Sequence, residues 1–116
     1  MQYLLLIYDN EKRWSKGYDK GEIDQYRAFG QEFAEKIKGG NALQPTGTAV
    51  TVRQRNGKSV VTDGPFAETK EQLGGFYLVE ARDRDEAAKI AAKIPGAKFG
   101  SIEVRPIMVF PQQQQV

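Results

Sequence analysis

The chain has 116 residues, a length that predicts one domain large enough to bury its own hydrophobic core. Its 17 basic and 15 acidic residues give a net charge of +2 and are interspersed, which argues against nucleic-acid binding. The longest apolar run, residues 3–8, is too short to span a bilayer and no signal peptide precedes it, so we expect a cytoplasmic protein without a membrane partner.

The sequence contains neither cysteine nor histidine. This excludes disulfides, thiolate nucleophiles, and zinc or iron sites built on cysteine or histidine ligands. Acid–base chemistry would fall to Asp, Glu, Lys or Tyr with a shifted pKa. We therefore expect no metal and no cofactor. A metal site would have to use oxygen ligands alone, from Asp63, Glu68 and Glu71.

The first predicted elements are a strand and a helix. Residues 3–8 form a continuous apolar run, typical of a central strand buried on both faces. A polar loop follows, and its one large apolar residue, Trp14, is expected to fold back over a surface. Asp19 followed by Glu22 is typical of a helix N-terminus. Apolar residues at spacings of three and four predict a helix that ends at Gly39-Gly40: Ile23, Tyr26, Phe29, Phe33 and Ile37.

Three short strands are predicted in the middle of the chain. Val50 and Val52 alternate with polar residues, the period of a half-buried strand. Asn56-Gly57 is the strongest short hairpin signal, so residues 58–62 should return as the partner strand. Residues 75–79 form another strand, and Gly74-Gly75 predicts a β-bulge where it begins.

A second helix and a final strand complete the pattern. Asp83 and Glu86 repeat the capping arrangement, an apolar face follows over residues 87–94, and Pro95-Gly96 ends the helix. Residues 102–107 alternate as a last strand. Pro106 lacks an amide hydrogen, so this strand should lie at an edge or contain a bulge there.

The predicted order is β-α-β-β-β-α-β, an α+β fold of the ferredoxin-like type with one additional strand segment. Two helices should cover one face of a mostly antiparallel sheet. The other face also carries apolar side chains, and we expect a second copy to cover it, as in a dimeric α+β barrel. The partner is thus predicted to be the chain itself. The domain should span residues 1–110, followed by a flexible, glutamine-rich tail over residues 111–116.

The segment over residues 61–77 contains the run Asp63-Gly64-Pro65-Phe66. Together with residues 3–8, the Leu43-Gln44-Pro45 step and the ending over residues 100–106, it resembles the bacterial YCII-related proteins of the DGPF subgroup. The resemblance covers roughly residues 1–109. It implies a ferredoxin-like domain that dimerises through its sheets and whose activity is largely unassigned.

Related YCII proteins were proposed to be enzymes because a histidine and an aspartate face a common cleft. Phe99 stands here where many DGPF relatives carry that histidine, so only Asp63 matches the proposed pair. Genes of the subgroup often neighbour those of extracytoplasmic-function sigma factors, which implies a regulatory setting.

Asp63 has two interpretations. As a carboxylate at a strand end beside Phe66 and Phe76, it would have a raised pKa and act as a general acid or base. Alternatively, Asp-Gly-Pro is turn chemistry, in which the carboxylate accepts backbone N–H bonds. The turn role is favoured, and the two roles can coexist.

The residues after Asp63 form the predicted ligand site: Phe66, Glu68, Lys70, Glu71 and Phe76. A pocket at the junction of two sheets would be lined by Phe66, Phe76 and Lys70, with Lys70 contacting an anionic group. The alternative is a solvated loop of mixed charge.

Three functions follow, in order of preference. The first is a small-molecule-binding dimer, accessory to a sigma-factor pathway. The second is a weak or vestigial enzyme that uses Asp63. The third is a protein-interaction module with an apolar patch outside the dimer interface.

Overall fold

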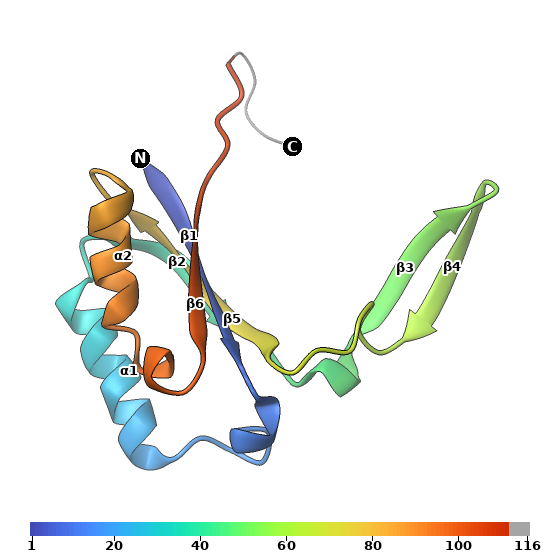
Figure 1. The fold of residues 1–116 in the computed structure, drawn as a ribbon, viewed down its shortest axis with the longest axis horizontal. Coiled ribbons are helices and arrows are strands. Elements are labelled where there is room, and N and C mark those ends of the chain that lie inside the picture. The colour runs from blue at the N-terminus through green and yellow to red at the C-terminus, as the bar shows by residue number, and fades with distance from the viewer. Residues whose placement is uncertain (112–116) are drawn as a thin grey trace.

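A computed structural model describes residues 1–111 of the chain (Figure 1). A four-stranded antiparallel sheet has the order β2-β5-β1-β6, from strands β1 (Gln2–Asp9), β2 (Ile37–Ala42), β5 (Gln72–Glu80) and β6 (Ser101–Pro106). With helices α1 (Lys20–Glu32) and α2 (Arg84–Ala92), this is the ferredoxin-like arrangement. The predicted α+β class is confirmed. The division at residue 110 stays a prediction, and the predicted tail beyond Pro111 lies outside the described residues.

Both helices cover the same face of this sheet (Figure 1). Strand residues alternate between faces, so one face presents Tyr3, Leu5 and Val79 to the helices, and all three are buried. Phe29 of α1 packs against Tyr77 with ring centroids 5.0 Å apart. The helix α2 contributes its predicted apolar face to the same core, residues Ala87, Ile90 and Ala91, followed by Ile94.

The N-terminal strand β1 is central, as predicted, but it is not buried on both faces. The face opposite the helices carries five apolar side chains that are only half-buried in one chain: Leu4, Leu6 and Tyr8 of β1, with Phe76 and Leu78 of β5. We call this surface the open face. An apolar run predicts burial of both faces, whereas the described residues of a single copy supply helices for one face.

The first helix is shorter than predicted. It ends at Glu32 with Phe33 as its cap, and Ile37 begins strand β2 instead of continuing the helix. A Cβ at Gly40 would lie 2.6 Å from the carbonyl oxygen of Phe76, so glycine here allows β2 to lie close against β5. The glycine pair that was interpreted as a helix end therefore belongs to an edge strand. Phe33 and Ile37 both pack against the core, but they do so from outside the helix.

The two strands predicted around Asn56-Gly57 form a hairpin of their own rather than part of the main sheet. Strands β3 (Val50–Arg55) and β4 (Lys58–Asp63) pair only with each other, and Asn56 and Gly57 both have positive φ, 52° and 76°. The hairpin projects away from the sheet and helices (Figure 1). We call it the hairpin arm, residues 50–63.

The β-bulge predicted at the glycine pair is confirmed. Ile7 pairs with Gly75 whereas Tyr8 pairs with Leu73, so Gly74 is the extra residue. The indole of Trp14 lies against Gly74, where a Cβ would come within 3.2 Å of the ring. Trp14 is 5% exposed, which confirms that it folds back over a surface.

Candidate functional site

A surface hollow of about 260 Å³ lies beside the loop that connects the hairpin arm to β5. We call it the loop hollow. It is lined mainly by apolar atoms, and its residues come from three separate parts of the chain: Tyr8, Thr46, Pro65, Phe66, Ala67, Thr69, Glu71, Gln72 and Leu73. Such a mixture of an apolar wall with few polar groups is typical of small-molecule sites.

Hydrogen bonds fix one wall of the loop hollow. The carboxylate of Glu11 accepts bonds from Thr46, at 2.6 Å from the hydroxyl and 3.0 Å from the backbone N–H. The side chain of Gln72 accepts from the backbone N–H of Glu11 at 3.0 Å and donates to the carbonyl of Thr69. These bonds hold together the loop before β5, the start of β5 and the turn after β1.

A second set of bonds fixes Glu71. Its Oε1 accepts a hydrogen bond of 3.0 Å from the hydroxyl of Ser101 on β6. The hydroxyl of Thr69 donates to the backbone carbonyl of Glu71 at 2.7 Å. One oxygen of the Glu71 carboxylate is therefore anchored, and Glu71 is one of the residues that line the loop hollow.

The structure separates the predicted site residues. Phe66 and Glu71 line the loop hollow, with Phe66 80% exposed, whereas Glu68 and Lys70 are exposed and lie outside its lining. Asp63 is exposed at the end of β4, and the next residue, Gly64, takes the turn conformation with φ at 92°.

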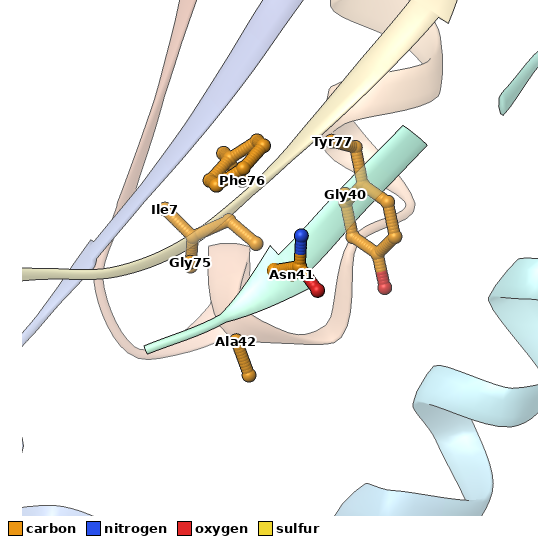
Figure 2. A pocket seen from close by; sticks show the side chains of 7 residues that line it. All are labelled: Ile7, Gly40, Asn41, Ala42, Gly75, Phe76 and Tyr77. Carbon is orange, nitrogen blue, oxygen red and sulfur yellow. The ribbon is translucent and has the colours of Figure 1, made fainter. Parts of the chain in front are cut away.

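Phe76 belongs to a different surface, a smaller pocket of about 190 Å³ formed between β2 and β5 (Figure 2). Gly40, Asn41 and Gly75 line that pocket beside the ring. Phe66 and Phe76 therefore do not share one pocket in a single chain, and the other aromatic residue that lines the loop hollow is Tyr8.

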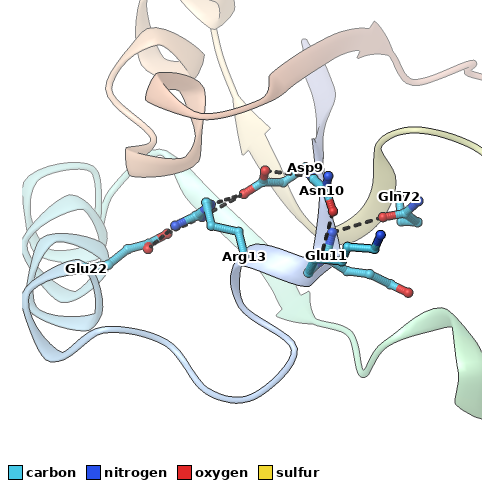
Figure 3. A network of polar contacts seen from close by, with 7 residues as sticks. Asp9, Asn10, Glu11, Arg13, Glu22 and Gln72 are labelled. Atoms are coloured by element: carbon cyan, nitrogen blue, oxygen red, sulfur yellow. Dashed lines mark hydrogen bonds and ion pairs between the residues drawn. The ribbon is translucent and has the colours of Figure 1, made fainter.

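A largely buried ion-pair network at the C-terminal end of β1 was not predicted. The guanidinium of Arg13 donates to Asp9 Oδ2 at 2.8 Å and, through two nitrogens, to both oxygens of Glu22 at 2.8 and 2.9 Å (Figure 3). Asp9 and Glu22 are 5% and 6% exposed. Glu22 was expected to serve the N-terminus of α1, but Asp19 alone caps it, by accepting bonds from Gly21 and Glu22 N–H groups.

Aromatic rings surround this network. The guanidinium carbon of Arg13 lies 4.0 Å from the ring centroid of Phe99, a cation–π contact. Hydrogen bonding to Glu22 raises the pKa of Arg13, so it stays charged. Burial, followed by the negative charge of Glu22, raises the pKa of Tyr18 and of Tyr26. Both carboxylates of the network are thus paired to a guanidinium that stays charged.

Within residues 1–111, no group of three acidic side chains converges closely enough to hold a metal ion. In the same part of the chain, no helix has the length and apolar character needed to cross a membrane.

The sequence model of the YCII-related domain matches residues 1–111. The chain belongs to the YCII-related family. An uncharacterised protein from Rhizobium meliloti (strain 1021) is 40% identical to this YCII-related chain over 117 residues, which cover 95% of the chain and 94% of the relative.

Among solved structures, this YCII-related chain is similar in fold to 5-chloro-2-hydroxyhydroquinone dehydrochlorinase (TftG) from Burkholderia phenoliruptrix AC1100, solved in complex with 2,5-dihydroxybenzoquinone. The TM-score is 0.53 at 19% sequence identity, covering 93% of this chain and 94% of the dehydrochlorinase. The likeness supports the ferredoxin-like α+β fold.

Proposed function

We propose that this YCII-related chain binds a small molecule in the loop hollow. The observation that carries the proposal is the lining itself, in which an aromatic and aliphatic wall surrounds a single fixed carboxylate, Glu71. Phe66 is 80% exposed, and an aromatic ring held at the rim of a hollow loses water contact when a ligand covers it. The complex of the dehydrochlorinase with 2,5-dihydroxybenzoquinone is compatible with such a role for the fold.

The partner is proposed to be a second copy of the chain. The open face presents its five apolar side chains on the two central strands, β1 and β5, and the described residues include no further helix to cover it. The hairpin arm carries three valines on one face, Val50, Val52 and Val61, each about 60% exposed. An isolated two-stranded hairpin is marginally stable in water, so these valines need a partner surface as well. In a twofold dimer each chain would supply both surfaces to the other.

The binding role is preferred to the enzymatic alternative. A general acid or base needs burial or a charged neighbour to shift its pKa, and it must reach a cavity. Asp63 is exposed and is not part of the lining of the loop hollow. The Asp63-Gly64-Pro65-Phe66 run supports a place in the DGPF subgroup, and the link to a sigma-factor pathway stays a prediction from that resemblance.

The site is tested by titrating small aromatic compounds into the protein and following backbone amide shifts by NMR. We expect the shifted amides to cluster at the loop hollow. Phe66→Ala should weaken the binding affinity at least tenfold. Phe110→Ala, which removes another exposed ring outside the hollow, is the matched control. Equal weakening by both variants, or shifts confined to other surfaces, would contradict the proposed site.

The dimer is tested by sedimentation equilibrium. Val52→Lys places a charge on the apolar face of the hairpin arm and is expected to shift the protein towards monomer. Thr62→Lys adds the same charge to the opposite face of the same hairpin and is the control, because neighbouring strand positions alternate between faces. A wild type that sediments as a monomer at all concentrations would refute the dimer.

A further inference from the structure

We infer that the loop hollow selects uncharged or cationic aromatic molecules that carry a hydroxyl or amine donor, and rejects anionic ones. This inference rests on the proposed function and adds the chemical class of the ligand. It differs from the sequence-based expectation, in which Lys70 would contact an anionic group, because Lys70 is exposed outside the hollow.

The charge on the lining of the loop hollow is negative. Among the described residues that line it, Glu71 is charged and no lysine or arginine is present. A second carboxylate, that of Glu11, lies directly behind Thr46 and holds that residue by two hydrogen bonds. An anionic ligand would meet like charge without a compensating cation, which costs binding free energy in a partly desolvated site.

The hydrogen-bonding groups of the wall favour a ligand that donates. The hydroxyl of Thr46 already donates to Glu11, and the hydroxyl of Thr69 already donates to the carbonyl of Glu71. Both hydroxyl oxygens keep acceptor capacity. Glu71 accepts from Ser101 through Oε1, and among the described residues its second carboxylate oxygen has no hydrogen-bond partner, so that oxygen can accept a strong bond from a donating ligand.

The apolar wall and the volume fit one aromatic ring with small substituents. A dry apolar cavity of about 150 Å³ is sufficient for benzene. The loop hollow, at about 260 Å³, leaves room for one or two polar groups as well. The rings of Phe66 and Tyr8 offer flat contact surfaces, and aromatic pairs gain further from stacked or edge-to-face geometry.

Three ring compounds of similar size separate the effect of charge: 4-methylphenol, benzylamine and benzoate, which are neutral, cationic and anionic at pH 7. We expect benzoate to bind at least tenfold more weakly than either of the others in NMR titrations. Glu71→Gln keeps an acceptor for Ser101 but removes the charge, so it should narrow the gap between benzylamine and benzoate at least threefold. Glu35→Gln, an exposed carboxylate near the end of α1, makes the same change in net charge and is the control.

The outcomes distinguish this inference from the function on which it rests. Benzoate binding as tightly as the other two, or a gap that Glu71→Gln leaves unchanged, overturns the inference on ligand class while the binding site stands. Failure of all three compounds to shift amides around the loop hollow at millimolar concentration overturns the proposed function, and the inference with it. Circular dichroism confirms that each variant retains its fold.

Discussion

Replacing Arg13 by methionine tests whether the ion-pair network holds the start of α1 to the end of β1. Methionine preserves much of the side-chain volume and the contact with the ring of Phe99 but removes the guanidinium. Asp9 and Glu22 are then left as two carboxylates, each almost fully buried and without a cation. Wild type carries one net negative charge in this network, and the variant carries two.

The expected loss follows from the burial of each partner. Removing one member of a buried ion pair costs about 3–5 kcal/mol, because the remaining charge is desolvated without compensation. The Arg13 side chain is 30% exposed, so water reaches part of the network. We therefore expect a loss of about 3 kcal/mol in the free energy of unfolding, at the lower end of that range. This is a large part of the total stability of a domain of this size.

Urea titration at matched protein concentration measures the effect, because the apparent stability of an oligomer depends on concentration. Two further variants separate charge from packing. Glu22→Gln removes the excess negative charge and keeps an acceptor for Arg13, with an expected loss of about 1 kcal/mol. A triple variant, Asp9→Asn with Arg13→Met and Glu22→Gln, should be more stable than Arg13→Met alone. A loss below about 1 kcal/mol for Arg13→Met, or a triple variant less stable than it, would refute the electrostatic reasoning.

Further predictions concern backbone packing, alkaline pH and the turn at Asp63-Gly64. Gly100→Ala should prevent stable folding, because a Cβ there would overlap the carbonyl oxygen of Tyr8. Gly30 in α1 has open space around it, so Gly30→Ala should raise the free energy of unfolding by about 0.5–1 kcal/mol in urea titrations. The raised pKa of Tyr26 means that the folded state favours its neutral form. Its contribution to stability is thus complete below the ordinary value of 10.0 and is lost as pH rises above it. Thermal unfolding should show this loss, and Tyr26→Phe should reduce it. Asp63→Asn should change the free energy of unfolding by less than about 0.5 kcal/mol, because the side chain is exposed, and a loss of about 1–3 kcal/mol would instead identify a turn-capping carboxylate.

Local rules predicted those parts of the fold whose causes are local. The caps at Asp19 and Asp83 and the turn at Asn56-Gly57 depend on residues within a few positions of one another, and the bulge at Gly74 was indicated by an adjacent pair of glycines. These features were predicted from the sequence, except that Glu22, expected to take part in the cap at Asp19, pairs with Arg13 instead.

The missed elements depend on partners that are distant in the sequence. Strand β2 contains two glycines and no alternating pattern, and it is extended because its backbone pairs with β5. The Arg13 network required knowing that the turn after β1 meets the first turn of α1. The loop hollow joins Tyr8, Thr46 and the loop before β5, and no local pattern connects these three segments.

The central position of β1 has a consequence for how the chain folds during synthesis. Both strands that pair with β1 are made after it, and β6 is among the last described residues to be made. The apolar run over residues 3–8 therefore leaves the ribosome long before its neighbours exist, whereas the hairpin arm contains all of its own pairing and can close within microseconds. Non-local pairing of this kind slows folding and exposes unpaired apolar strands to aggregation. The central strand is thus protected only after β5 and β6 have been made, whereas the hairpin arm, which contributes no residue to the main core, can pair without waiting for them.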